Sequence, residues 1–487
     1  MRLTVSRRVG HDRPTPPIDW EPGSGSQEGR ARCRRAGPAT GACRPSRPAD
    51  PGTTTSVPVS TPEGEISVTV HLSARLRDVR GSAIRDLLAL TARDDVISLA
   101  GGLPGTDLLP RERIAAALAT AAGDPATLQY GETVGLRRLR EVLAGTEGAR
   151  LGRALIPTEI VVTTGSQQAL DLVARTTLDP GDAVVVEDPV YVGALQVFQA
   201  AGATLHAVPV DDGGMDVDAL AGLLATGLRP RLVHTVSSFH NPRGVTLSGD
   251  RRARLAALAD RYGFLVVEDD PYGLLAFDGP PPVPVAAHGE RVVRLGSVSK
   301  VLAPALRVGW LTGPAALLAA VERLKQCSDL CGSTLTHAVA AELLADTHWF
   351  DGHLGMLRIA LRERAGALTG AVRAAFGDAV TCSVPTGGMF CWLEFTDGTR
   401  PAELLPHALR GGVGFVPGEA FAVTRRLDGA ARLCFASNPP PLLHTAVGRL
   451  AGTWREQAAV RRRVEPCVRS SNCWSATPSS PTTPSRP

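Results

Sequence analysis

From about residue 82 onward, short apolar runs alternate with stretches of helical periodicity, and no other feature of the sequence constrains the fold as strongly. The apolar runs predict strands at residues 160–163, 183–187, 204–208, 231–235, 264–268 and 291–295. The stretches between them predict helices at 167–177, 192–201 and 249–262. Such alternation is typical of a parallel α/β sheet, which binds ligands at the carboxyl ends of its strands.

A different pattern follows this alternation. One long amphipathic run at 348–376 predicts a single helix. Residues 382–437 then indicate a smaller α+β region, with strands at 389–394 and 432–435. We therefore expect two folded parts rather than one continuous sheet.

The two ends of the chain differ from its middle in composition. Residues 1–50 contain ten arginines and five acidic residues, and residues 461–487 contain five arginines and one acidic residue. Both are rich in Pro, Gly or Ser and are expected to be disordered, because they can bury little apolar surface. Their arginines lack interleaved aromatic residues and helical periodicity, so we expect no nucleic-acid partner.

Composition also bears on location and on metals. The first residues lack the apolar run of a secretory signal, and no stretch is apolar enough to span a bilayer. The expected location is the cytoplasm, with no membrane partner. Four of the nine cysteines lie in the two ends of the chain and the other five show no CxxC or Cys/His ligand spacing, so no metal site is expected.

Lysine is rare in this chain, since only Lys300 and Lys325 occur among 52 basic residues. A primary amine can attack a carbonyl group and a guanidinium cannot, so Lys300 is a candidate for covalent chemistry. The alternative is that the two lysines reflect a composition bias alone. Lys325 lies in a helical stretch of mixed polarity and is expected at the surface.

Two motifs at the ends of predicted strands indicate further chemistry. The turn Gly165-Ser166-Gln167 opens a helix and can bind a phosphate through free N–H groups, although such a turn also serves as an ordinary helix cap. Asp269 follows a strand that should be buried, where a carboxylate needs a cationic partner. A protonated heterocyclic nitrogen would serve, and a solvated acidic loop is the alternative.

The order of the motifs is more specific than any one of them. After the turn at Gly165 come Asp188-Pro-Val-Tyr191, Asn241-Pro-Arg243-Gly244, Asp269-Asp-Pro-Tyr272, Ser297-Val-Ser-Lys300 and Arg307-Val-Gly309. From about residue 72 to 455 the chain thereby resembles the pyridoxal-phosphate-dependent aminotransferases of fold type I, class I/II. It is most similar to the 2-aminoadipate aminotransferase-like group, through Ile97-Ser-Leu-Ala-Gly-Gly-Leu-Pro104 and Leu128-Gln-Tyr-Gly131.

This resemblance implies an aspartate-aminotransferase-like α/β fold. It implies a large domain with a mostly parallel seven-stranded sheet, and a smaller α+β domain. The large, cofactor-binding domain is expected at 112–345 and the small domain at 72–111 and 346–460. A disordered extension at 1–71 and a disordered tail at 461–487 would flank them.

The resemblance also implies how pyridoxal 5'-phosphate is held. Lys300 would bind the cofactor covalently and move a proton during the reaction, and Asp269 would keep the ring nitrogen protonated. Tyr191 would stack on the ring, while Asn241 and Tyr272 would bind its phenolic oxygen. The phosphate would be bound by Gly165, Ser166, Gln167, Ser297 and Arg307, and by Tyr130 of the neighbouring subunit in a homodimer with shared active sites.

For the substrates, the resemblance implies transfer of an amino group from an L-amino acid to a 2-oxo acid, either 2-oxoglutarate or pyruvate. The expected specificity is 2-aminoadipate-like or broad. Arg432 matches the arginine that binds the substrate's α-carboxylate, to which a planar guanidinium is well suited. Gly102 and Asn241 would also face the substrate.

Two departures from the family pattern leave the specificity open. Arg243 stands where threonine or alanine is usual, and it could lie at the cofactor's edge or point to solvent. Residues 75–80, expected near the substrate's side chain, combine three arginines with one aspartate. They could therefore favour either a dicarboxylate or a cationic side chain.

Two other functions use the same fold. Cofactor motifs do not distinguish aminotransferases from pyridoxal-phosphate-dependent cyclases, oxidases and eliminases of unusual amino-acid biosynthesis. The other alternative is the aminotransferase-like domain of a transcription regulator. Such a regulator needs a DNA-reading module of about 70 residues, and residues 1–71 do not show its helical pattern.

Overall fold

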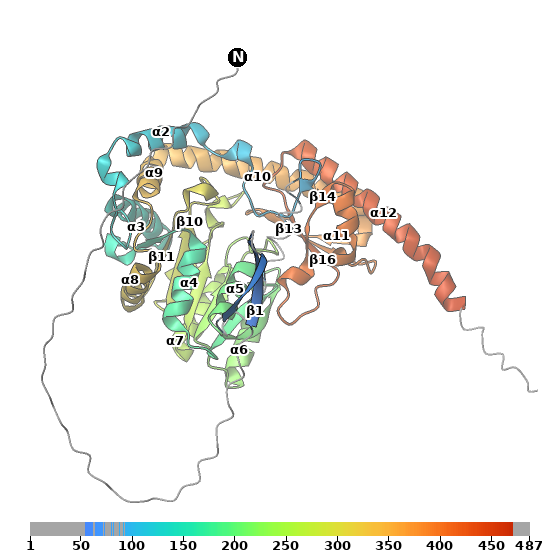
Figure 1. Cartoon of the computed structure of the whole chain (residues 1–487), viewed down its shortest axis with the longest axis horizontal. Helices are drawn as coiled ribbons and strands as arrows, with labels where there is room; N and C mark the ends of the chain where they lie inside the picture. The colour runs from blue at the N-terminus through green and yellow to red at the C-terminus, as the bar shows by residue number, and fades with distance from the viewer. Residues whose placement is uncertain are drawn as a thin grey trace, which may run out of the picture. The chain divides into compact units, whose positions relative to one another are not determined.

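The computed structural model describes residues 54–61, 64–71, 73, 79, 81, 87, 91 and 93–470 (Figure 1). Its main feature is one mixed sheet of eight strands. In spatial order the strands are β4 (Val161–Thr163), β11 (Gly309–Thr312), β10 (Val292–Ser297), β9 (Leu265–Asp269), β8 (Leu232–Thr235), β5 (Ala183–Asp188), β6 (Thr204–Asp211) and β7 (Gly214–Met215).

The sheet is mostly parallel, as expected. Neighbouring strands from β10 through β9, β8 and β5 to β6 run in the same direction. β11 is antiparallel to both of its neighbours, and the two-residue β7 at the edge is antiparallel to β6. The apolar runs of the sequence predict six of these strands but neither β11 nor β7, and β7 brings the count to eight rather than seven.

Helices cover both faces of this sheet, because successive side chains of a strand point to opposite sides. Val184 and Val186 of β5 pack with α4, α5 and α8, whereas Val185 packs with α6 and α7. All three valines are fully buried, and each contributes about 1.5–3 kcal/mol of hydrophobic free energy. These helices are α4 (Ser166–Thr177), α5 (Val192–Ala200), α6 (Val217–Ala225), α7 (Gly249–Tyr262) and α8 (Ala315–Ser328).

A second, four-stranded sheet is formed by the C-terminal part of the chain. Its antiparallel strands are β12 (Val380–Cys382), β13 (Phe390–Phe395), β16 (Ala430–Cys434) and β15 (Val416–Pro417). The 30-residue helix α10 (Thr347–Phe376) packs against β12 and against α12 (Pro440–Ser470), and α11 (Pro401–Arg410) also packs on α12. Phe390 and Leu433 lie fully buried in the cluster that this sheet shares with α10 and α12.

The segment around residue 100 is held by the C-terminal part of the chain, partly in a separate two-stranded sheet. β3 (Ile97–Ser98) pairs in parallel with β14 (Val413–Gly414), and the N–H of Cys434 donates to the carbonyl of Leu99. This pairing supports assigning the segment to the small domain, whose boundaries remain a prediction. Beyond the segment, α2 (Arg111–Ala122) and α3 (Arg137–Leu151) both pack on α9 (Thr334–Ala345).

Two segments expected to be disordered contain regular structure. β1 (Thr54–Thr61) and β2 (Gly64–His71) form an antiparallel hairpin, in which threonine and valine, residues that favour strands, are frequent. Helix α12 continues to Ser470, into the predicted tail. The rest of the two segments lies outside the described residues. None of the described helices has an apolar stretch long enough to cross a membrane.

Candidate active site

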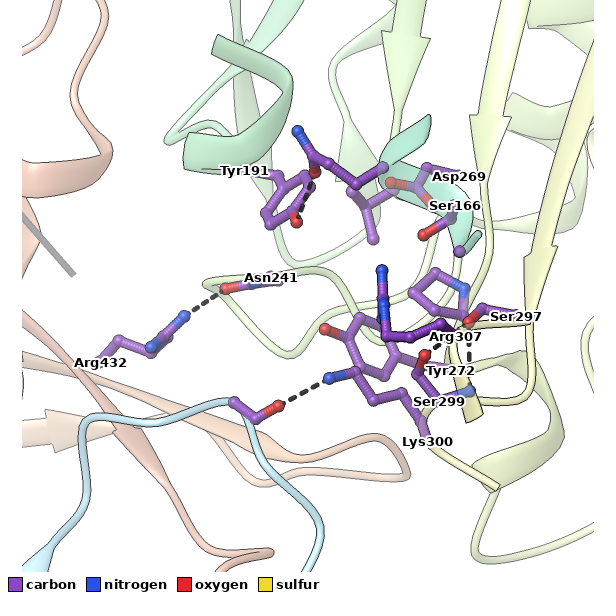
Figure 2. Close-up of a pocket in the computed structure, with 15 residues that line it drawn as sticks. Ser166, Tyr191, Asn241, Asp269, Tyr272, Ser297, Ser299, Lys300, Arg307 and Arg432 are labelled. Carbon is purple, nitrogen blue, oxygen red and sulfur yellow. Dashed lines mark hydrogen bonds between the residues drawn. The ribbon is translucent and has the colours of Figure 1, made fainter. Parts of the chain in front are cut away.

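A cavity of about 350 Å³ opens at the carboxyl ends of the parallel strands (Figure 2). Asp269 ends β9, Ser297 ends β10 and Gly165 follows β4, so separate strands supply its walls. The lining residues are Gly102, Gly165, Ser166, Gln167, Tyr191, Val236, Asn241, Asp269, Pro271, Tyr272, Ser297, Ser299, Lys300, Arg307 and Arg432.

Every site residue proposed from the sequence lines this cavity except Tyr130. Three lining residues are not proposed from the sequence: Val236, Pro271 and Ser299. Pro271 and Ser299 lie inside two of the sequence motifs, so their neighbours carry the signal for them. Val236 follows β8 and is apolar, and nothing in its sequence context distinguishes it from a core valine.

Lys300 lies in the loop after β10 and reaches into the cavity. Its Nζ donates a hydrogen bond to the carbonyl oxygen of Gly102 at 2.7 Å. Burial lowers the pKa of Lys300 to about 8, and the guanidinium groups of Arg432 and Arg307 act in the same direction. The amine is therefore uncharged in part of the molecules near neutral pH, as a nucleophile or base must be.

Gly165 turns the chain from β4 into α4. Its φ of +109° is one that residues with a side chain rarely adopt. Ser166 then begins α4, whose N-terminus carries a partial positive charge. The guanidinium of Arg307 reaches the same turn and donates a hydrogen bond to the carbonyl oxygen of Thr164. A helix N-terminus and a guanidinium meet here, an arrangement that suits a phosphate.

Ser297 and Ser299 add hydroxyl groups beside this turn. The Ser297 Oγ donates to the Ser299 Oγ at 2.9 Å and accepts from the backbone N–H of Ser299 at 3.1 Å. Both side chains are buried. Because a hydroxyl can rotate to donate elsewhere, Ser297 is able to turn its proton toward an anion in the cavity.

Asp269 is buried, and one of its carboxylate oxygens lacks a partner. Its Oδ1 has no hydrogen bond to any of the residues that the structure describes. Its Oδ2 lies 3.9 Å from Nε2 of His234 on β8. A buried carboxylate oxygen without a donor costs free energy, so this position favours a ligand that donates a proton to it.

Arg432 on β16 is a buried cation, and its Nε has no hydrogen bond among the described residues. One NH group donates to Oδ1 of Asn241 at 2.7 Å, as Figure 2 shows, and the other donates to the carbonyl of Ala100. The rings of Phe390 and Phe421 lie 4.5 and 5.0 Å from the guanidinium carbon. Burial lowers the pKa of Arg432 to about 10, which reflects the cost of removing this charge from water.

Two tyrosines complete the walls. The hydroxyl of Tyr191 donates to Oε1 of Gln167 at 3.0 Å, and the Gln167 amide in turn donates to the carbonyl of Gly193. The ring of Tyr272 packs edge-on against Phe390, with the ring centroids 5.8 Å apart. Burial raises the pKa of both phenols, so each remains protonated and able to donate.

A network of buried charges anchors the end of β9. Asp270 lies 2.9 Å from Arg294 and 3.0 Å from Arg150. Burial alone would raise the pKa of Asp270, but the charges of these two arginines outweigh it and hold the pKa well below its ordinary value. Arg294 also pairs with Glu147 at 2.7 Å and lies 3.6 Å from Glu268. The loop that carries Asp269 and Tyr272 is therefore tied to the sheet at its base.

Tyr130, predicted to bind the phosphate, and Arg243, whose position the sequence left open, both lie away from the cavity. Tyr130 is 79% exposed and does not line it. Arg243 turns aside as well: it donates to the carbonyl of Val210 and pairs with Asp212 at 3.3 Å, and it does not line the cavity. Of residues 75–80, the structure describes only Val79, and the expectation about their charges lies outside the described residues.

Lys325 contradicts the sequence-based expectation. Its side chain is fully buried rather than at the surface, and its Nζ donates to both carboxylate oxygens of Asp329, at 2.7 and 3.0 Å. The mixed polarity of α8 concealed this, because the partner lies just beyond the last residue of the helix.

The cavity fits pyridoxal phosphate, the cofactor that the resemblance implies. The unpartnered Oδ1 of Asp269 offers an acceptor for a protonated ring nitrogen. Lys300 offers an amine with a lowered pKa for an aldehyde carbon. Gly165 and Arg307 form a site for a phosphate at the start of α4. The ring nitrogen, the aldehyde and the phosphate of the cofactor thus each find complementary chemistry.

Comparisons with known proteins agree with this geometry. Residues 94–450 match the family model described as Aminotransferase class I and II. Over 395 residues the chain is 37% identical to the aromatic-amino-acid aminotransferase 1 of Thermococcus litoralis, a match that covers 80% of this chain and 94% of that protein.

Solved structures give the same picture. The kynurenine aminotransferase of Pyrococcus horikoshii, solved in complex with PMP, superposes with a TM-score of 0.75 at 38% identity, covering 79% of this chain and 97% of that one. The alpha-aminoadipate aminotransferase of Thermus thermophilus, complexed with N-(5'-phosphopyridoxyl)-L-leucine, superposes with a TM-score of 0.74 at 34% identity. That match covers 80% of this chain and 98% of the other.

Proposed function

The chain belongs to the class I and II aminotransferases and is a pyridoxal-phosphate-dependent transaminase of the aspartate-aminotransferase-like fold type I, and from this premise we propose how its cavity handles cofactor and substrates. Lys300 binds the cofactor covalently, Asp269 accepts a hydrogen bond from its protonated ring nitrogen, and Tyr191 lies against its ring. Asn241 and Tyr272 bind the phenolic oxygen of the cofactor. The cofactor's phosphate is bound by Gly165, Ser166, Gln167, Ser297 and Arg307.

When bound, pyridoxal phosphate supplies an electron sink that allows the α-proton of an amino acid to leave. We propose that the substrate's amino group first takes the place of Lys300 on the cofactor, and that the freed Nζ of Lys300 then accepts this proton and later gives it up. A pKa of about 8 permits the transfer in both directions near neutral pH. The buried, protonated phenol of Tyr272 stays a hydrogen-bond donor throughout.

The buried guanidinium of Arg432, in the same cavity as Lys300, is the observation that carries the proposal. A planar carboxylate can pair with it and compensate its charge. L-amino acids and 2-oxo acids both carry that carboxylate next to the reacting carbon. One arginine would therefore bind both substrates of an amino-group exchange.

We propose a broad donor specificity that includes aromatic amino acids and 2-aminoadipate, with 2-oxoglutarate or pyruvate as the acceptor. Relatives named for aromatic amino acids and for alpha-aminoadipate support this range.

We also propose a homodimer in which each active site receives Tyr130 of the partner subunit. Tyr130, Leu128 and Leu103 are large side chains with 79%, 65% and 49% of their surface exposed. Leu103 directly follows Gly102 of the cavity, so a partner that covered these side chains would lie beside the active site. Burial of such a group in a symmetric interface would remove its unfavourable contact with water.

The test is an absorption titration of the purified full chain with pyridoxal phosphate, then with single amino acids and finally with 2-oxoglutarate. We expect a visible band that is absent in Lys300→Ala, that one class of amino acid bleaches, and that the 2-oxo acid restores. A band that bleaches and never returns would assign the chain to the cyclases, oxidases or eliminases instead.

A second arm tests Arg432 by pairing each amino acid with the amine that lacks its carboxylate, such as phenylalanine with phenethylamine. The wild type should bleach at least about 100-fold faster with the amino acid, because two charge-assisted hydrogen bonds are worth about 3 kcal/mol. Arg432→Met should lose that preference. If it keeps the preference, another residue binds the carboxylate.

A further inference from the structure

A series of hydrogen-bonded polar side chains connects the buried Lys325 of α8 to the turn Thr164–Gly165–Ser166, the proposed phosphate turn. Lys325 pairs with Asp329, and the second carboxylate oxygen of Asp329 accepts a hydrogen bond from the amide of Gln168 at 2.7 Å. The carbonyl of the same Gln168 side chain accepts from the backbone N–H of Thr164 at 2.8 Å. Each link is within hydrogen-bond distance, so the chain is continuous.

Thr164 is held at both ends of its backbone. Its N–H is bound by Gln168, and its carbonyl accepts from the guanidinium of Arg307. Gly165 follows directly, with the positive φ that turns the chain into α4. The orientation of the turn therefore depends on one amide from inside the protein and one cation at the cavity.

The ammonium of Lys325 is the fixed end of this chain. Its side chain is fully buried, and a buried ammonium persists only when it is paired and hydrogen-bonded. The nearby His337 does not compete for the carboxylate, because burial and then the charge of Lys325 lower its pKa to about 4 and keep it neutral. Asp329 is thus directed toward Lys325 on one side and Gln168 on the other.

Resting on the cofactor site proposed above, we infer that Lys325, Asp329 and Gln168 are positioning residues that hold the turn Thr164–Gly165–Ser166 in the conformation that binds the cofactor's phosphate. None of the three lines the cavity. They act only through the backbone of Thr164. Their contribution should therefore appear in affinity for the phosphate group and not in affinity for the rest of the cofactor.

The experiment compares two aldehydes, pyridoxal phosphate and unphosphorylated pyridoxal, in equilibrium absorption titrations of the cofactor-free full chain. Gln168→Leu breaks both hydrogen bonds of the amide at a half-buried helix position. We expect it to weaken binding of pyridoxal phosphate about tenfold, as breaking one internal hydrogen-bond network does. Binding of pyridoxal should change less than about twofold.

A second variant tests the far end of the chain. Lys325→Met with Asp329→Leu removes both charges together, so neither is left buried and alone, and it leaves the Gln168 amide without its acceptor. The affinity of this double variant for pyridoxal phosphate should fall by the same factor as that of Gln168→Leu. The affinity of the triple variant should fall no further than that of either, because all three residues act along one path. The inhibition constant of inorganic phosphate, measured against pyridoxal phosphate, should rise by a similar factor in each variant.

Asp171→Asn is the matched control. It removes an exposed ion pair with Arg175 on the same helix α4 and should leave both affinities unchanged. Equal losses for both aldehydes would mean that the three residues only support the fold, and additive losses would mean that they form no single chain. A wild type that binds the two aldehydes equally would overturn the phosphate site itself, and Lys300→Ala separates that failure from loss of the covalent bond.

Discussion

Lys300 and Arg432 are two cations that share one cavity, and burial lowers the pKa of both, from a higher ordinary value in the arginine. It lowers the pKa of Lys300 to about 8, so the lysine can exchange its proton near neutral pH. It lowers that of Arg432 only to about 10, so the guanidinium stays charged. The first residue is suited to chemistry and the second to recognition, although both begin as cationic side chains.

The pKa of Lys300 predicts a pH profile for cofactor uptake. The uncharged fraction of its amine rises as pH increases through about 8, so the rate at which the cofactor-free protein takes up pyridoxal should rise and then level off above that pH. Burial is the main cause of this value, and Cys434, Arg432, Arg307 and Asp269 adjust it. Stopped-flow absorbance measures this pH profile. Pyridoxal is the aldehyde used, because it has no phosphate group that would itself titrate.

Nα-acetyl-lysine in solution is the control for that profile. Its amine has the ordinary lysine pKa of about 10.4, so its rate should keep rising to higher pH. A protein whose rate follows the acetyl-lysine curve would show that Lys300 is not shifted.

At the scale of elements, the ionic network at the carboxyl end of β9 supports Asp269 and the loop that follows it. Replacing Arg294 by methionine would leave Glu147, Glu268 and Asp270 buried without that cation. We expect Arg294→Met to lower the free energy of unfolding by about 3–5 kcal/mol, measured by urea denaturation. Arg175→Met, at an exposed pair, should change it by less than about 0.5 kcal/mol.

Strand β11 approaches the phosphate turn so closely that only glycine fits. A Cβ on Gly309 would lie 2.5 Å from the carbonyl carbon of Gly165, which is backbone and cannot move aside cheaply. Gly309→Ala should therefore weaken binding of pyridoxal phosphate by about tenfold or more, since overpacking costs about 1–3 kcal/mol. Absorption titration measures this affinity.

Gly222 on α6 gives the comparison, because a Cβ there would meet nothing within 4 Å. Gly222→Ala should leave cofactor affinity unchanged and raise the free energy of unfolding by about 0.5–1 kcal/mol through helix propensity. If both alanine variants bind the cofactor as the wild type does, the close approach of β11 has no bearing on the turn.

The sequence predicts the parallel strands and the cavity residues because each motif follows an apolar run at a strand end. It does not predict β11, whose four residues, Gly309–Thr312, make no long apolar run, and whose antiparallel direction depends on pairing with β10 and β4. It also misplaces Lys325, because the burial of this side chain depends on the packing of α4 against α8, although its partner Asp329 is only four residues away. Features that depend on a partner elsewhere in the fold are the ones that local patterns miss.

At the scale of the whole molecule, the exposed Tyr130 predicts an assembly with shared sites. Light scattering should give about twice the 51.0 kDa mass of one chain. Mixed dimers of Lys300→Ala and Tyr130→Phe subunits should contain one site with wild-type cofactor affinity, because both changes fall on the other site. If Tyr130 acted within its own subunit, no site of the mixed dimer would bind as the wild type does.

Backbone carbonyl groups around residue 100 accept hydrogen bonds from two cations of the cavity, Arg432 and Lys300. The carbonyl of Ala100 accepts from Arg432, and that of Gly102 accepts from Lys300. In the binding mode proposed above, cofactor and substrate would replace these main-chain contacts, so binding would be an exchange of partners and not a simple addition. The measured affinity would then be the difference between two sets of contacts, in a segment that β3 anchors by pairing with β14.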